Sequence, residues 1–192
     1  MTEELPLEDW LEASGTLKRG HFQLSSGLHS PAYVQCALLL QSPERARRVG
    51  QALAEKVAST QPDSVLSPAM GGLIIGHEVA EALGVPFRFV ERSAGVMKLR
   101  RGFSLRPGER IVIVEDVITT GRSTLEAVAV VRESGAHLSA IASILDRTGG
   151  RHAFDVPFLS LFALDLPAYE GDSCPLCASG EPISKPGSRP VP

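Results

Sequence analysis

The feature that most restricts the fold of this chain is a continuous run of β-branched residues, Ile-Val-Ile-Val, at positions 111–114. A run of this kind is typical of a strand buried on both faces, as in parallel sheets covered by helices on each side. Apolar residues at helical spacing follow at positions 123–134, and Gly135 comes directly after them, as at the end of a helix. A buried strand that leads into an amphipathic helix predicts an α/β architecture.

The same alternation of strand and helix patterns extends over most of the chain. Strands are predicted at residues 64–67, 87–91, 140–145 and 159–164, and helices are predicted after Ser42 and from the Gly71-Gly72 pair onward. Strands that alternate with helices pair in parallel through right-handed crossovers. We therefore expect an α/β fold with an open, mainly parallel, doubly wound sheet flanked by helices. Ligands of such sheets bind at the carboxyl ends of the strands.

The two ends of the chain do not follow this alternation. A short helix is predicted at residues 6–13, short strands are predicted at 22–24 and 32–35, and the last residues are rich in Pro, Gly and Ser. We expect one domain over residues 1–192, with a small N-terminal hood at 1–37, an α/β core at 38–165 and a C-terminal tail at 166–192.

Composition excludes several classes of protein. A net charge of −3 argues against broad nucleic-acid binding. No apolar stretch approaches the roughly 20 residues that a membrane-spanning helix needs. The first residues, Met-Thr-Glu-Glu-Leu-Pro, lack the basic and apolar regions of a secretory signal, and three cysteines do not indicate a disulfide framework. We expect a cytoplasmic protein without nucleic-acid or membrane partners.

The chemistry is concentrated after the buried strand. Glu115 and Asp116 lie at its carboxyl end, and a turn of hydroxyl residues and Gly121 leads into the helix. The N–H groups at a helix N-terminus favour phosphate, and two carboxylates suit ribose hydroxyls or a hydrated Mg²⁺. A phosphorylated sugar satisfies both requirements. The alternative is an ordinary strand-turn-helix junction with a capping hydroxyl.

Residues 111–124 closely resemble the signature with which type I phosphoribosyltransferases bind 5-phosphoribosyl-1-pyrophosphate (PRPP). The resemblance implies the fold of that family, and it implies that Glu115 and Asp116 bind the ribose hydroxyls. It also implies that Mg²⁺ is held mainly through PRPP, so that no metal site is made by protein ligands alone. The resemblance also implies a cradle for the 5-phosphate and a pyrophosphate loop. The PRPP-binding residues of the cradle are Thr119, Thr120, Gly121, Arg122 and Ser123, and those of the loop are Ala69, Met70 and Gly71.

Residues 92–107 show no sustained periodicity and are predicted to form a mobile loop. The stretch resembles the flexible catalytic loop of orotate phosphoribosyltransferases, which in that family closes over the pyrophosphate of the neighbouring subunit. The resemblance implies PRPP-binding and catalytic roles for Arg92 and Lys98, and catalytic roles for Arg100 and Asp116. It also implies a homodimer in which the 92–103 loop serves the partner. Taken alone, a basic loop is more often a solvated surface turn.

Two further segments resemble the orotate-binding parts of that family. They imply orotate contacts from Ser26, Gly27, Tyr33, Thr119 and Arg147, of which Arg147 would pair with the carboxylate of the base. The implied function is Mg²⁺-dependent transfer of ribose 5-phosphate from PRPP to orotate in pyrimidine biosynthesis. A purine phosphoribosyltransferase and a non-enzymatic PRPP-sensing regulator are the alternatives. Many orotate enzymes have a lysine near Ser25, an aromatic-lysine pair at the pyrophosphate loop and a loop histidine, which this chain lacks.

Cys174 and Cys177 have the spacing of metal ligands. A structural zinc site needs four ligands, and no second pair of cysteines is present in the sequence. We therefore expect no metal at this pair. A site shared across a dimer, or one completed by His152, is the alternative.

Overall fold

The computed structural model describes residues 6–24 and 27–186. Their contacts divide them into two compact units, one formed by residues 40–164 and the other by residues 6–39 together with residues 165–186. Ser26, one of the predicted orotate contacts, lies outside the described residues. No helix in the described part of the chain has the length and apolar character needed to cross a bilayer.

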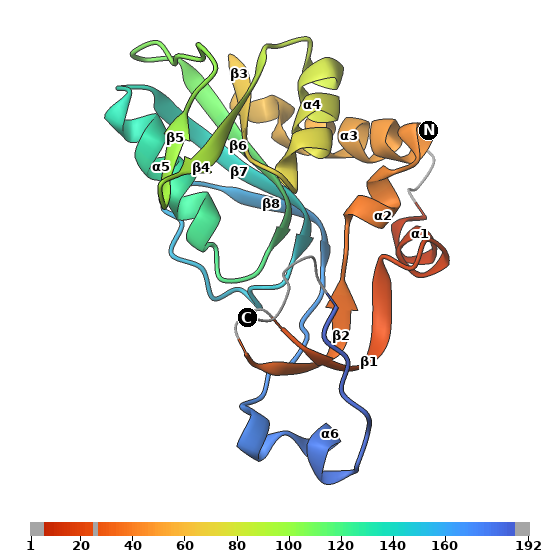
Figure 1. Cartoon of the computed structure of the whole chain (residues 1–192). Coiled ribbons are helices and arrows are strands. Elements are labelled where there is room, and N and C mark those ends of the chain that lie inside the picture. The colour runs from red at the N-terminus through yellow and green to blue at the C-terminus, as the bar shows by residue number, and fades with distance from the viewer. Residues whose placement is uncertain (1–5, 25–26, 187–192) are drawn as a thin grey trace. The chain divides into compact units, whose positions relative to one another are not determined.

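The first unit is built on a six-stranded sheet with the order β5-β4-β3-β6-β7-β8 (Figure 1). Its strands are β3 (Ser64–Pro68), β4 (Phe87–Ser93), β5 (Val96–Leu99), β6 (Arg110–Ile118), β7 (His137–Asp146) and β8 (Phe158–Ala163). All neighbours pair in parallel except β4 and β5, which are antiparallel. The expected mainly parallel, doubly wound sheet is confirmed.

Helices cover both faces of this sheet (Figure 1). They are α3 (Pro43–Val57), α4 (Gly72–Leu83) and α5 (Arg122–Glu133), with a short 3₁₀ turn, η1 (Ala58–Thr60), after α3. The core between α5 and the sheet contains Ile111 and Ile113 of β6 and Val128 and Val131 of α5. Because both faces are covered, β6 is buried at every position from Ile111 to Glu115, as its uninterrupted β-branched run predicted.

The segment predicted to be an irregular loop is in part a β-hairpin, so that prediction is wrong for residues 92–99. Ser93 of β4 pairs with Val96 of β5. The two turn residues between them, Ala94 and Gly95, both have positive φ values, of 51° and 82°, as in the two-residue turns that join twisted strands. Alanine is uncommon in that conformation, and this is why the turn was not evident from sequence.

The second unit combines the N-terminal hairpin with the C-terminal segment. It contains α1 (Leu7–Ala13), β1 (Leu17–Gln23), β2 (His29–Val34), η2 (Gly171–Ser173) and α6 (Pro175–Ala178), and α2 (Ala37–Leu40) follows the hairpin. Strand β1 begins at Leu17, earlier than predicted. Its register with β2 shifts between Arg19 and Phe22. A bulge of this kind interrupts the alternation of apolar and polar residues on which strand prediction depends.

Candidate functional site

The site lies where the strand order of the sheet reverses. From β3 the chain proceeds outward through β4, and it then returns to place β6 on the other side of β3. In open α/β sheets the connections at such a point diverge and leave a crevice at the carboxyl ends of the two strands. Those ends carry Pro68 of β3 and the Glu115-Asp116 pair of β6.

The two carboxyl groups are held in an environment that disfavours their charged forms. The Glu115 side chain is buried, and burial, together with the neighbouring Asp116 charge, raises its pKa to about 8, against an opposing hydrogen bond from Thr124. Burial also raises the pKa of Asp116, although the backbone N–H of Val117 donates a 2.9 Å hydrogen bond to its Oδ1. Hydroxyl donors or a cation facing this pair would relieve the cost of its charge.

The β3–α4 loop reaches these carboxylates. A Cβ added to Gly71 would lie 2.6 Å from Oδ1 of Asp116, which is much closer than side chains approach one another. At Gly72 an added Cβ would lie 2.9 Å from the carbonyl oxygen of Val114 and 3.4 Å from Oε2 of Glu115. Two parts of the chain that are 44 or more positions apart in the sequence thus form one surface. One is the loop segment of Ala69, Met70 and Gly71, and the other is the acid pair.

A helix N-terminus follows the acid pair after a short turn. Gly121 precedes the first turn of α5 with a φ of 71°, a conformation that favours glycine. An added Cβ there would also lie 3.0 Å from the Phe154 ring. Around this helix N-terminus the exposed residues are Thr119, Thr120, Arg122 and Ser123. Helices α4 and α5 therefore both start at the same edge of the sheet, and neither is capped there by a side-chain hydrogen bond.

Arg147 follows β7, the strand next to β6. Its backbone N–H donates to the carbonyl oxygen of Ile118 at 2.8 Å. The guanidinium is partly buried, which lowers its pKa, and its buried Nε has no hydrogen-bond partner among the residues that the structure describes. An arginine that is withdrawn from water with a donor unused is suited to a ligand carboxylate.

The basic residues of the β4–β5 hairpin differ in their partners. Arg92 forms an ion pair with Glu126 of α5 and donates a 2.8 Å hydrogen bond to the carbonyl oxygen of Gly95. Both Arg100 and Arg101 pair with Glu91. Lys98 is exposed, and its ammonium group is in no ion pair within the described ranges 6–24 and 27–186. The ion pair between Glu126 and Arg92 was not predicted, because nothing in the sequence around Glu126 distinguishes it from other charged residues on the surface of a helix.

The remaining predicted contacts lie in the second unit. Gly27 is in the connection between β1 and β2, with a φ of 90°. Tyr33 is a half-buried residue of β2 that packs against the ring of Phe22, with a centroid separation of 5.9 Å.

The cysteine pair has two histidine neighbours that were not evident from the sequence. His21 and His29 of the hairpin lie beside Cys174 and Cys177. His152, the expected alternative, instead stacks on Phe154 with a centroid separation of 4.9 Å.

Comparison with known proteins gives consistent results. The family model described as "Phosphoribosyl transferase domain" matches residues 37–168. The chain is 49% identical over 183 residues to the orotate phosphoribosyltransferase of Thermotoga maritima, covering 95% of this chain and 98% of that protein. It is 45% identical over 191 residues to the orotate phosphoribosyltransferase of Caulobacter vibrioides, covering 98% of each. The crystal structure of orotate phosphoribosyltransferase from Aeropyrum pernix matches with a TM-score of 0.70 and 27% identity, covering 82% of this chain and 93% of that one.

Proposed function

The chain belongs to the phosphoribosyl transferase family, as an orotate phosphoribosyltransferase of pyrimidine biosynthesis, and we propose that it binds PRPP at the carboxyl edge of β3 and β6. The reaction transfers ribose 5-phosphate from PRPP to orotate and yields orotidine 5-monophosphate and pyrophosphate. The enzyme is therefore a pentosyltransferase. The observation that carries the location of the PRPP site is the approach of Gly71 to Asp116.

Each part of PRPP has a counterpart at this edge. The 5-phosphate would bind the N-terminus of α5, where the backbone N–H groups and the exposed hydroxyls of Thr119, Thr120 and Ser123 are available. The ribose hydroxyls would donate to Glu115 and Asp116. The pyrophosphate would bind at the β3–α4 loop, whose helix begins without a side-chain cap. These assignments account for the location of both carboxylates between two anion-binding elements.

Mg²⁺ also fits this set of donors. It is a hard cation that prefers oxygen ligands and usually retains several waters while it contacts carboxylates and substrate phosphates. Glu115 and Asp116 are the residues that would hold it, through its waters and the ribose oxygens. When bound, Mg²⁺ supplies positive charge that neutralises the pyrophosphate oxygens. Its charge would also offset the cost of burial that raises the pKa values of the two carboxyl groups.

The orotate carboxylate would pair with Arg147. Its guanidinium can form two parallel hydrogen bonds with a carboxylate, and its buried Nε lacks a partner within the described residues. The base would also contact Thr119, and the resemblance to the family's orotate-binding segment assigns further contacts with the base to Ser26, Gly27 and Tyr33. Purine bases carry no carboxylate, so an arginine in this role selects for orotate by charge.

Loss of pyrophosphate leaves positive charge on the ribose ring and concentrates negative charge on the leaving group. Catalysis of such a step depends on positioning and electrostatic stabilisation. We assign the stabilising cations to Lys98 and Arg92 of the β4–β5 hairpin and to Arg100, which directly follows β5, with Asp116 holding the ribose. Lys98 is the first choice, because its ammonium group is exposed and carries no ion pair within residues 6–24 and 27–186.

We further propose a homodimer in which residues 92–103 serve the partner's site, and a cytoplasmic location. The first proposal is supported by the resemblance of this segment to loops that act across a dimer. The second is supported by the sequence, whose three cysteines do not indicate a disulfide framework.

The function is tested by following orotate absorbance with PRPP and Mg²⁺, beside adenine, hypoxanthine, guanine, xanthine and uracil. We expect turnover of orotate alone. Arg147→Ala should lower kcat/KM for orotate by about tenfold or more, which corresponds to about 1.4 kcal/mol, and Arg147→Lys should recover part of the loss. Arg151→Ala, an exposed arginine in the loop that follows, is the matched control. Turnover of a purine with no effect of Arg147→Ala would refute the orotate assignment, and PRPP binding without turnover would indicate a sensor.

A further inference from the structure

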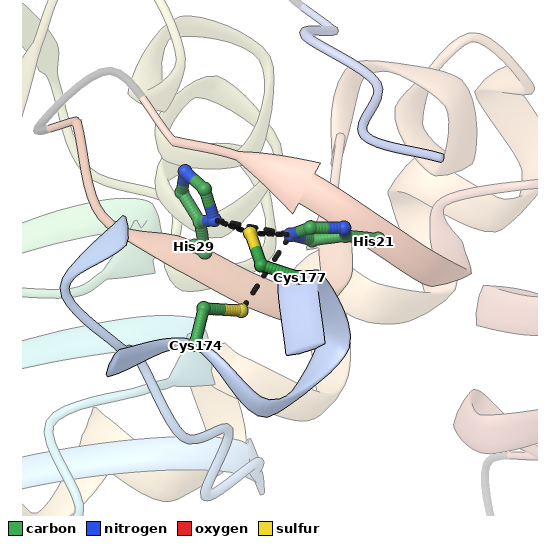
Figure 2. Close-up of side chains that lie close together, drawn as sticks. All are labelled: His21, His29, Cys174 and Cys177. Carbon is green, nitrogen blue, oxygen red and sulfur yellow. Dashed lines mark hydrogen bonds between the residues drawn. The ribbon is translucent and has the colours of Figure 1, made fainter. Parts of the chain in front are cut away.

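We propose that His21, His29, Cys174 and Cys177 form a tetrahedral zinc site that fastens the C-terminal segment to the N-terminal hairpin. The two histidines come from β1 and β2, Cys174 directly precedes α6, and Cys177 lies within that helix. Figure 2 shows that the four side chains point toward one another. Their four ligand atoms all lie within 4.8 Å of one another.

Four of the six distances between these atoms are close to the edges of a tetrahedron around zinc. With Zn–S bonds of about 2.3 Å and Zn–N bonds of about 2.05 Å, neighbouring ligand atoms are separated by about 3.3 Å for two nitrogens and about 3.6 Å for nitrogen and sulfur. Nε2 of His21 and Nδ1 of His29 are 3.1 Å apart. Sγ of Cys174 is 3.6 Å and Sγ of Cys177 is 3.8 Å from Nε2 of His21. Cys177 Sγ is 3.3 Å from Nδ1 of His29.

Hydrogen bonding alone does not account for this arrangement. Three of these contacts converge on Nε2 of His21, but one ring nitrogen offers a single hydrogen or a single lone pair. The other ring nitrogen of His21, Nδ1, lies 2.8 Å from the carbonyl oxygen of Glu181, which can only accept. Nδ1 therefore carries the hydrogen, and the lone pair of Nε2 faces the centre of the cluster. Histidines that bind metals are commonly oriented by such a bond to a backbone carbonyl.

The C-terminal segment needs such a link because it has almost no apolar core. Among its described residues, 165–186, only Cys174 belongs to the buried apolar set. The segment is attached to the hairpin at two places. His29 and Tyr169 exchange backbone hydrogen bonds of 2.8 Å in both directions, and Ser184 is paired with Phe22. Cys174 and Cys177 lie on the stretch between these attachments, so that a metal would hold the middle of this stretch to the two histidines of the hairpin.

The set of ligands points to zinc in a structural role. Two thiolates and two imidazoles in tetrahedral geometry are typical of Zn²⁺, and four protein ligands leave no open position for a substrate. A disulfide between the two cysteines would leave the convergent histidines unexplained. His21, His29 and Cys174 are buried, whereas Cys177 is exposed, which provides a route by which the ion can enter.

The test is metal analysis of the full-length protein together with titration of the reduced, metal-free protein with Co²⁺. We expect about one zinc per chain, and for Co²⁺ the intense visible bands of a tetrahedral ion together with thiolate charge-transfer absorption. Cys177→Ser, at the exposed ligand, should weaken Co²⁺ binding by about 100-fold or more, since even loss of an outer partner of a metal ligand typically weakens binding 10–100-fold. The control is Cys36→Ala, at a cysteine outside the cluster, which should bind as the wild type does.

Several outcomes would overturn the proposal. A folded wild-type protein that contains no zinc and develops no tetrahedral Co²⁺ spectrum has no such site. Wild-type spectra and affinity in Cys177→Ser would show that the ligands are others, and a Cys174–Cys177 disulfide detected by mass spectrometry in protein isolated under reducing conditions would replace the metal site with a redox pair. If Cys177→Ser does not fold, the wild-type metal content and Co²⁺ titration decide the matter by themselves.

Discussion

Gly71 and Asp116 approach so closely that a Cβ at position 71 would lie 2.6 Å from Oδ1 and 2.8 Å from Oδ2 of the carboxylate. The loop after β3 and the acid pair of β6 are therefore fitted to one another, with no space for a side chain between them. Since we assign pyrophosphate to the loop and ribose to the carboxylates, the fit sets the distance between the two halves of the proposed PRPP site.

Replacing Gly71 with alanine should therefore impair catalysis more than folding. The added methyl group must displace either the loop or the Asp116 carboxylate, and small displacements of positioning groups are costly in rate. We expect kcat/KM for PRPP to fall about tenfold or more, or about 1.4 kcal/mol.

The control for this variant is Gly108→Ala. Gly108 is exposed, has a φ of 76° and has nothing within 4 Å of an added Cβ, so its replacement strains only the backbone, by about 1 kcal/mol. It should lower the melting temperature and leave kcat/KM unchanged. Equal kinetic effects of the two substitutions would show that the Gly71 result reflects stability alone.

The raised pKa of Glu115, about 8 against an ordinary value of 4.5, makes the stability of the ligand-free protein depend on pH. Protonated Glu115 is favoured in the folded state, so this contribution is complete below pH 4.5 and is lost as the pH rises toward 8. Glu115→Gln is neutral throughout. We expect the stability of the variant relative to wild type to increase with pH over this window, by up to about 1.4 kcal/mol per pH unit. Thermal unfolding of both proteins across the window measures it, and a difference that does not change with pH would contradict the prediction.

Lys98 and Arg147 should complement each other across the proposed dimer. We expect Lys98→Ala and Arg147→Ala each to lose most activity. If each hairpin serves the partner's site, one of the two sites in a mixed dimer is intact, and random exchange of subunits makes half of all dimers mixed. A quarter of all sites in the mixture are then intact, so the mixture should recover about a quarter of the wild-type activity.

Mixing Lys98→Ala with Arg92→Ala provides the matched control. Both changes lie on the same hairpin, so no site in a mixed dimer receives an intact one, and activity should stay low. Absence of recovery in the Lys98 and Arg147 mixture, after exchange has been verified by mass spectrometry, would mean that the hairpin acts within its own subunit.

The buried ion pair between Arg88 and Glu109 should contribute to stability more than any surface pair. Nη1 of Arg88 lies 2.7 Å from Oε1 of Glu109, with side chains 18% and 1% exposed. Burial alone raises the pKa of Glu109, but hydrogen bonds from the Arg106 backbone, Ser64 and Arg88 outweigh it and lower the pKa. Arg88→Met leaves the buried carboxylate with only the exposed Arg106, whose Nε lies 3.6 Å from Oε2 of Glu109, and should cost about 3 kcal/mol in urea unfolding at neutral pH.

The comparison for this variant is Arg132→Met. Arg132 pairs with Asp155 on the surface, where the side chains are 54% and 66% exposed, and its loss should cost much less than the loss of Arg88. Because Glu109 has a depressed pKa, its contribution is present above its ordinary value of 4.5 and is lost as the pH falls. The difference between Arg88→Met and wild type should therefore shrink in acid, and similar costs for the two variants would rule out a special role for the buried pair.

Much of the architecture was evident from local patterns. The β-branched run of β6 and the helical spacing of α5 predicted a buried parallel strand and its covering helix, and both are present. Such patterns depend on which faces of one element are buried, and the sequence records this directly. The assignment of PRPP and orotate contacts to individual residues remains a prediction.

The sequence by itself determined most of the alternation of strands and helices in the core, the acid pair at the end of β6 and the family to which this signature belongs, because each of these is encoded within a few consecutive residues. Only the tertiary structure decided that Gly71 meets Asp116 and that residues 92–99 form a hairpin. It also decided that His21 lies beside Cys174, which is 153 positions away in the chain. Contacts between distant segments follow from strand order, register and turn conformation, and no local periodicity carries that information.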